Sequence, residues 1–294
     1  MKRKLISSVI VLSMLALSAC GKGESGDIEL SEEMIEDIVA DLPDDVTDGE
    51  LPTEDEERYL GISDQIECFV QSVDAWWPEE DVEITYGITV TDLDHNGQAE
   101  LILAESGNSG NYTTSLIYEV NMDYTTLDKL EYNYSNRTDE FEEPDIIKDE
   151  VRMYLKDGKY YYIFDDLTKD GYAYFCNKKL AVCKSDYEIN VDTLGFLEAQ
   201  DDGDGDEPNY SVKVTDANGN PSDLETYRNA DLAAFSDAEV SVATIKWEYI
   251  SNKDEITNDL LNSLYQGFTI KDGDGANIIY CDPANMEVPY EVID

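Results

Sequence analysis

Acidic and amide side chains stand at regular intervals in the segment Asp92-Leu93-Asp94-His95-Asn96-Gly97-Gln98-Ala99-Glu100. Counted from Asp92, they fill positions 1, 3, 5 and 9, and glycine fills position 6. Oxygen ligands at this spacing suit Ca²⁺, because alternate side chains of a tight loop point inward, glycine permits the sharp turn, and the carbonyl at position 7 adds a ligand. The segment therefore predicts one Ca²⁺ held by Asp92, Asp94, Asn96, Gln98 and Glu100, with an acid-rich β-turn that binds no ion as the alternative.

This segment differs from an EF-hand. An EF-hand carries a bidentate acid at position 12 and lies between two helices. Position 12 here is Leu103, and the flanking segments 84–91 and 101–104 have the composition of strands. We therefore expect a strand, a loop and a second strand.

Three other acidic segments carry a weaker signal. Residues 201–207 are dense in carboxylates, but no strand or helix is expected to hold them, so we interpret them as a solvated loop. Residues 215–220 and 271–275 have the composition of turns.

The sequence offers little support for catalysis. Its single histidine, His95, lies inside the loop, so a Ser-His-Asp or Cys-His arrangement would have to include it. One histidine and scattered cysteines also give no zinc ligand cluster. A pair of carboxylates, as used in glycoside hydrolysis, stays open because 67 acidic residues guarantee close pairs. We expect a protein that is not an enzyme, with a glycan-active hydrolase as the alternative.

The elements that must position the loop are mainly strands. A capping box at 53–56 begins a helix whose apolar spacing continues to Trp77, before Pro78. Hairpin-forming Asp157-Gly158 separates two strands. A second helix begins near Asn252 and ends at Gly267. Further strands are predicted at 115–120, 151–155, 160–164, 172–176, 179–183, 210–215 and 240–250. The fold class is α+β with a mainly antiparallel sheet.

The first twenty residues predict export. A basic segment, Met1-Lys2-Arg3-Lys4, precedes a short apolar run and then Leu17-Ser18-Ala19-Cys20. The apolar run is shorter than the roughly 18–20 residues that span a bilayer. We predict a signal peptide at 1–19, and the alternative is an ordinary secretory peptide with a chance cysteine.

Composition divides the rest of the chain. Residues 20–52 are rich in glycine, serine and acids, with one short amphipathic helix at 34–42, and are interpreted as a tether. Residues 53–200 carry the first helix and the loop. Residues 201–294 form a β/α lobe that is either separate or part of the same domain.

The net charge is −47. A field of this sign repels phosphate backbones, which excludes nucleic acid as a partner, and it attracts cations.

Four cysteines lie beyond Cys20. An even number in an exported protein permits two disulfides. Because 176–183 has the pattern of a hairpin, the preferred pairs are Cys176–Cys183 and Cys68–Cys281, and buried free thiols are the alternative.

Two resemblances follow from these motifs. The Leu17-to-Cys20 pattern resembles the lipobox of bacterial lipoproteins, which implies cleavage before Cys20, its lipidation, and a position at the extracellular face of the cytoplasmic membrane. The segment ITVTDLDHNGQAELIL at 88–103 is similar to the calcium loop of FG-GAP and VCBS propeller blades and to uncharacterised Gram-positive surface lipoproteins. This resemblance covers about Tyr59 to Tyr162. It implies a blade-like β unit and a bound cation, but no reaction.

This chain departs from the blade family in two ways. Asn96 occupies position 5, and the chain has one convincing copy of the loop, whereas a full propeller needs about four or more blades. The expected protein is therefore a membrane-anchored, extracellular, calcium-stabilised binding or structural module with an unknown protein or glycan partner. A transporter solute-binding protein is a third possibility, which the strand-dominated pattern disfavours.

Overall fold

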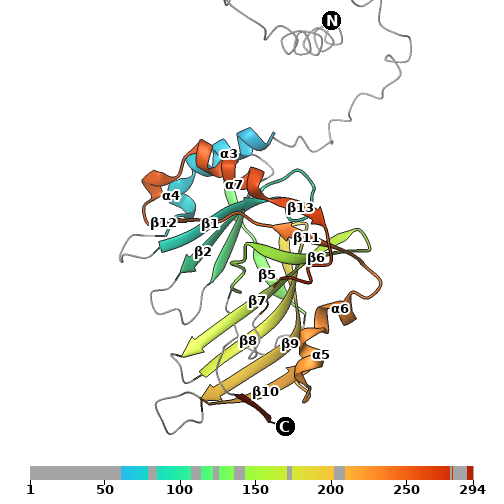
Figure 1. The fold of residues 1–294 in the computed structure, drawn as a ribbon. Coiled ribbons are helices and arrows are strands. Elements are labelled where there is room, and N and C mark those ends of the chain that lie inside the picture. Colours follow the sequence, from blue (N-terminus) through green and yellow to red (C-terminus); the bar gives the residue numbers. More distant parts are fainter. Residues whose placement is uncertain are drawn as a thin grey trace, which may run out of the picture. The chain divides into compact units, whose positions relative to one another are not determined.

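Two β-sheets packed against each other organise the fold (Figure 1). The computed structural model describes residues 61–78, 85–106, 114–121, 126–135, 143–170, 174–201, 209–278, 280 and 290–293. Strands dominate these residues and most neighbouring strands are antiparallel, which confirms the predicted α+β, mainly antiparallel class.

The small sheet holds the loop. Its strand order is β12-β1-β2-β3-β4, and every pair is antiparallel. The strands are β1 (Thr85–Thr91), β2 (Glu100–Ser106), β3 (Ser115–Val120), β4 (Leu127–Lys129) and β12 (Glu248–Ile250).

The large sheet has the order β13-β11-β6-β7-β8-β9-β10-β14, and β5 pairs with the beginning of β9. The β5–β9 and β10–β14 pairs are parallel. The strands are β5 (Glu131–Tyr134), β6 (Glu150–Lys156), β7 (Lys159–Asp170), β8 (Tyr174–Ser185), β9 (Glu188–Asp201), β10 (Tyr210–Asp216), β11 (Glu239–Thr244), β13 (Thr269–Asp272) and β14 (Tyr290–Ile293).

Helices cover the outer faces. Three helices lie over the small sheet: α3 (Ile62–Gln71), α4 (Val73–Trp76) and α7 (Asn258–Gly267). The short 3₁₀ helix η2 (Lys253–Glu255) directly precedes α7 in the chain. α5 (Leu224–Arg228) and α6 (Ala230–Ala234) lie beside the large sheet (Figure 1).

Strand alternation divides the core into layers. On β2, Leu101 and Leu103 belong to the cluster under the helices, whereas Ile102 and Ala104 belong to the cluster between the sheets. Both faces of the small sheet are therefore buried. Full burial of each such leucine stabilises the fold by about 1.5–3 kcal/mol.

Several predicted elements are confirmed. The Asp157-Gly158 hairpin joins β6 to β7, and both residues have positive φ angles, 53° and 77°, as a two-residue hairpin turn requires. Asn252 caps η2 with a capping box, although α7 itself begins after Thr257.

Other predictions were wrong. The predicted strands 172–176 and 179–183 do not form a hairpin, because their described residues, from Tyr174 onward, belong to the single strand β8. The predicted strand 240–250 is two strands, β11 and β12, which belong to different sheets. The first helix is interrupted at Ser72. The prediction also lacked β9 and the short helices α5 and α6.

The chain forms one compact unit from Arg58 onward. Strands from 201–294 lie in both sheets, since β12 pairs with β1 and β11 pairs with β6. This arrangement agrees with the alternative in which 201–294 is part of the same domain. The predicted signal peptide, tether and capping box at 53–56 lie outside the described residues.

The predicted Cys176–Cys183 disulfide is absent, and the three described cysteines, Cys68, Cys176 and Cys183, form no disulfide with one another. Cys176 and Cys183 stand seven residues apart on one extended strand, about 23 Å at the usual rise, whereas a disulfide joins Cα atoms about 4.4–6.8 Å apart. Cys281, and with it the second predicted pair, lies outside the described residues.

Candidate metal centre

The predicted loop connects two adjacent antiparallel strands, β1 and β2. Asp92 directly follows β1, and Glu100 begins β2. His95 and Gly97 have positive φ angles of 56° and 86°, so the chain reverses through left-handed backbone at these positions. This is the strand, loop and strand that the sequence predicts.

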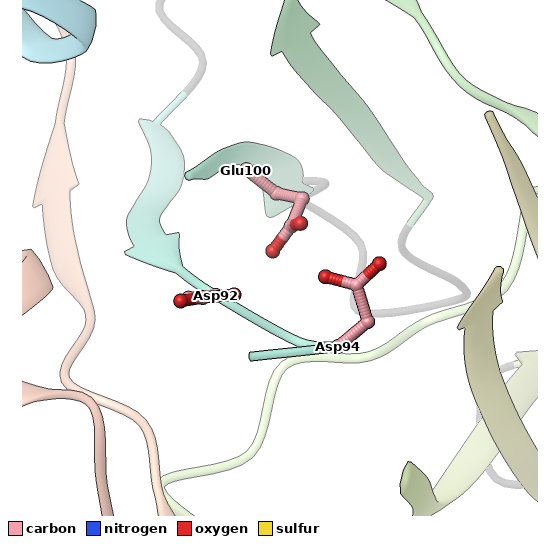
Figure 2. A group of neighbouring side chains, drawn as sticks. All are labelled: Asp92, Asp94 and Glu100. Carbon is pink, nitrogen blue, oxygen red and sulfur yellow. The ribbon is translucent and has the colours of Figure 1, made fainter. Parts of the chain in front are cut away.

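The loop brings three carboxylates together. Asp92, Asp94 and Glu100 each offer one oxygen, and these oxygens all lie within 4.8 Å of one another. Figure 2 shows the carboxylates of Asp94 and Glu100 turned toward each other, with Asp92 beside them. Three hard oxygen ligands at this separation are suited to a divalent cation such as Ca²⁺.

Asp92 organises the loop backbone. Its Oδ1 accepts a hydrogen bond from the Asn96 N–H at 3.0 Å, and its Oδ2 accepts one from the Gly97 N–H at 3.1 Å. These bonds hold the loop in its turn and direct the side chain inward.

Glu100 is buried and fixed on one side. Its Oε2 accepts hydrogen bonds from the Leu93 N–H at 2.7 Å and from the Thr91 hydroxyl at 3.2 Å. By strand alternation its side chain shares the face of Ile102 and Ala104, so it points toward the large sheet.

Two oxygens of this group lack hydrogen bonds. Within the described part of the chain, neither Oδ1 of Asp94 nor Oε1 of Glu100 accepts one, although both atoms are buried. Glu100 Oε1 still has the ammonium of Lys184, on β8, at 3.5 Å, whereas Asp94 Oδ1 has neither a hydrogen bond nor an ion pair within the described residues. A buried carboxylate oxygen without a partner costs free energy that a cation ligand would offset.

The other two predicted ligands have different contacts. The Asn96 side chain is exposed, donates to Asp94 Oδ2 at 3.1 Å and accepts from the Gln98 N–H at 2.6 Å. The Gln98 side chain donates to the Val120 carbonyl at 2.8 Å, which joins the loop to the end of β3. The structure thus brings together the carboxylates of three of the predicted residues, and the side chains of Asn96 and Gln98 help to shape the loop. The predicted ligand atom of Gln98 is its main-chain carbonyl, and this part stays a prediction.

A residue that sequence analysis missed supports the loop from behind. Gln65 on α3 donates to the Gly97 carbonyl at 2.9 Å and accepts from the Ala99 N–H at 2.7 Å. Gln65 is buried, and its amide satisfies both main-chain groups. A polar residue on the buried face of an apolar helix was the available signal.

Glu119 and Lys184 were also missed. Glu119 lies on β3 directly opposite Glu100. Lys184, on β8 of the large sheet, places its ammonium 2.9 Å from Asp94, 2.9 Å from Glu119 and 3.5 Å from Glu100. The lysine side chain is only 1% exposed. The site therefore spans both sheets.

Burial makes the ionised forms of these carboxyl groups less favourable. Burial raises the pKa of Glu100 well above its usual value, and Lys184 offsets only part of this effect. Burial likewise raises the pKa of Glu119 and of Asp92. Burial alone would lower the pKa of Lys184, but Glu100 and Glu119 raise it, so the ammonium stays charged.

His95 lies beside aromatic rings. Its ring is 4.3 Å from that of Tyr160 and 5.9 Å from that of Phe268, measured between centroids. The Tyr162 hydroxyl donates to the Leu93 carbonyl at 2.9 Å and lies 3.4 Å from His95 Nε2. These contacts attach the loop to β7.

The weaker acidic segments form turns where they are described. Asp216 Oδ1 accepts hydrogen bonds from the N–H groups of Asn218 and Asn220, and Asp274 Oδ1 accepts one from Ala276. Most of segment 201–207 lies outside the described residues.

Comparison of the sequence with protein-family models gives no match, and neither curated proteins nor solved structures match it. Among the described helices, none has both the length and the apolar character needed to cross a bilayer.

Proposed function

We propose that this chain is a lipid-anchored extracellular binding module whose two-sheet body is stabilised by one Ca²⁺ at the β1–β2 loop. One observation carries the cation site: Asp92, Asp94 and Glu100 converge within 4.8 Å, and two of their buried oxygens lack hydrogen bonds within the described residues. The sequence features at 1–20 support the anchor.

The same observation favours a structural role for the ion over catalysis. Glu100 is fully buried, Glu119 is 2% exposed and Asp92 is 9% exposed. A glycoside hydrolase must bring a sugar between two accessible carboxylates. These carboxylates are too buried for such access, which favours a structural role for a bound ion.

The melting temperature of the full chain in EDTA, Mg²⁺ and Ca²⁺ tests the proposal. A ligand at about a hundred times its Kd stabilises the folded state by about 2.7 kcal/mol, which raises the melting temperature by about 5–10 °C in a protein of this size. Ca²⁺ should produce this shift, and Mg²⁺ a smaller one because it gives up its water ligands reluctantly.

Two double variants locate the effect. Asp92→Asn/Asp94→Asn should abolish the Ca²⁺ response. Asp259→Asn/Asp272→Asn removes the same formal charge from exposed positions and should retain it. A wild-type melting temperature that Ca²⁺ leaves unchanged would overturn the cation site. A pull-down with cell-wall fractions, glycans and surface proteins tests the binding role, and retention of no ligand would refute it.

A further inference from the structure

The carboxylates of the loop already have a cation beside them, and it belongs to the protein. The Lys184 ammonium is 2.9 Å from Asp94 Oδ2 and 3.5 Å from Glu100 Oε1, so it contacts two members of the proposed Ca²⁺ triad. Its third contact is Glu119 Oε2 at 2.9 Å.

Strand register explains why a cation is needed there. Glu100 and Glu119 are direct cross-strand partners on β2 and β3, and both are buried. Like charges directly opposite on neighbouring strands destabilise a sheet. Lys184 continues the inward-facing alternation of Leu180 and Val182 on β8, and its side chain enters this cluster from the opposite sheet.

One ammonium does not neutralise the cluster. Three carboxylates contact Lys184, and Asp92 adds a fourth within reach of the same ion site. When all four carboxylates are ionised, three negative charges are not balanced by Lys184, and any ion that binds Asp94 and Glu100 must share them with the lysine.

We propose that Lys184 is a tethered internal cation that competes with Ca²⁺ for Asp94 and Glu100. It holds the two sheets together when no ion is bound, and it weakens the site when Ca²⁺ enters. This inference rests on the proposed function, since it assigns regulation to the same loop. A weakened site suits an extracellular module, for which Ca²⁺ dissociation constants are about 10⁻⁴–10⁻³ M.

The first experiment measures Ca²⁺ affinity of the full-length wild type and of Lys184→Met by isothermal titration calorimetry. Methionine keeps the length and apolar stem of lysine and removes its charge. We expect the Kd for Ca²⁺ to fall about tenfold or more in Lys184→Met, because a unit charge a few ångströms from the ion is removed. The ion-free variant should melt below the wild type, and Ca²⁺ should raise its melting temperature more than that of the wild type.

Lys178→Met is the matched control. Lys178 stands on the same strand and pairs with Asp166 at 3.2 Å, away from the triad. Its loss should leave Ca²⁺ affinity unchanged. An unchanged or higher Kd in Lys184→Met, beside wild-type protein that binds Ca²⁺, would overturn the competition and leave the proposed function standing.

Other outcomes separate the two proposals. If Lys184→Met binds Ca²⁺ and the wild type does not, the competition is supported and the proposal that the wild type binds Ca²⁺ is contradicted. No binding by either protein would overturn both.

A second measurement, by NMR, follows Lys184 in the wild-type protein and so does not depend on whether Lys184→Met folds. In wild-type protein with ¹³C-labelled lysines, Ca²⁺ should shift the Lys184 Cε resonance, assigned through Lys184→Arg, and leave that of Lys178 in place. Ca²⁺ binding with no change at Lys184 would contradict the inference.

Discussion

At the scale of single residues, the loop depends on a glutamine 32 positions earlier in the chain. Gln65 satisfies the Gly97 carbonyl and the Ala99 N–H, two main-chain groups that a helix covers. Buried main-chain groups left without partners cost about 1–3 kcal/mol each. Gln65 therefore helps to fix the geometry of the carboxylates by holding the main chain of the loop, since both of these hydrogen bonds go to main-chain groups.

Replacing Gln65 tests this dependence. Gln65→Leu keeps the volume of the side chain and removes both hydrogen bonds, so we expect a loss of about 2–4 kcal/mol in unfolding free energy and weaker Ca²⁺ binding. Urea denaturation and Ca²⁺ titration measure the two effects. Gln71→Leu changes an exposed glutamine at the end of the same helix and should alter stability by no more than about 0.5 kcal/mol. Equal losses in the two variants would show that the loop does not need Gln65.

At the scale of elements, a second buried polar group attaches α6 to the large sheet. Asp231 on α6 is fully buried. It accepts from Arg152 at 2.8 Å and from the Tyr154 hydroxyl at 2.9 Å, both on β6, and it lies 3.3 Å from Lys179 on β8. Burial alone would raise the pKa of Asp231, but Lys179 and Arg152 outweigh it and hold that pKa below its usual value. A short helix is thus joined to two strands by one carboxylate.

This shift gives a pH dependence with a defined sign. Because the pKa of Asp231 is lower in the folded than in the unfolded protein, its stabilisation is present above about pH 4 and is lost as the pH falls through the lower, folded value. Asp231→Asn should cost about 3–5 kcal/mol at pH 7, since it removes the anion that pairs with the buried Lys179 and the partly buried Arg152. The difference from wild type, measured in urea at pH 7 and pH 3, should shrink at the lower pH.

The control for this prediction is Asp237→Asn. Asp237 pairs with Lys156 at the surface, and its side chain is 72% exposed. Its replacement should leave the urea midpoint unchanged at both pH values. A difference between wild type and Asp231→Asn that is the same at pH 3 and pH 7 would contradict the assigned role of the ionised carboxylate.

The end of α7 shows why glycine stands at position 267. Gly267 was expected to end a helix, and it does end α7. Its φ angle is not among the positive values of the described glycines. A Cβ at this position would instead lie 2.4 Å from the Cβ of Lys246, so close packing explains the glycine.

At the scale of the whole molecule, the net charge and the proposed lipid anchor bear on where the protein acts. A net charge of −47 repels anionic polymers and concentrates cations near the surface. Such a field supports cation uptake at any well-formed carboxylate site, but it does not select one.

The anchor is tested by changing Cys20. Cys20→Ser should abolish incorporation of labelled fatty acid and move the protein from the detergent phase to the aqueous phase, because the acyl chains supply the membrane affinity. Cys68→Ser replaces a thiol on α3 and should behave as wild type. Unchanged fatty-acid labelling in Cys20→Ser would refute the lipoprotein prediction.

The sequence by itself determined the local features. Spacing from Asp92 to Glu100 specified the loop, alternation and turn residues specified most strands, and Asp157-Gly158 specified a hairpin, because these depend on neighbours within a few residues. The mainly antiparallel class followed from the same signals.

The tertiary structure alone decided which distant residues meet. Lys184 reaches the loop through the packing of two sheets, Glu119 through strand register and Gln65 through helix docking. The contacts of Lys184 and Glu119 have no local signature, since both faces of the small sheet are buried and hydrophobicity cannot distinguish them. Gln65 could be noticed as a polar residue on the buried face of a helix, but its partners could not be predicted from the sequence. Tertiary contacts also explain why the predicted hairpin at 172–183 did not form. Asn177, Lys178 and Lys179 have turn-like composition, but β7 and β9 pair with them on both sides and keep β8 extended.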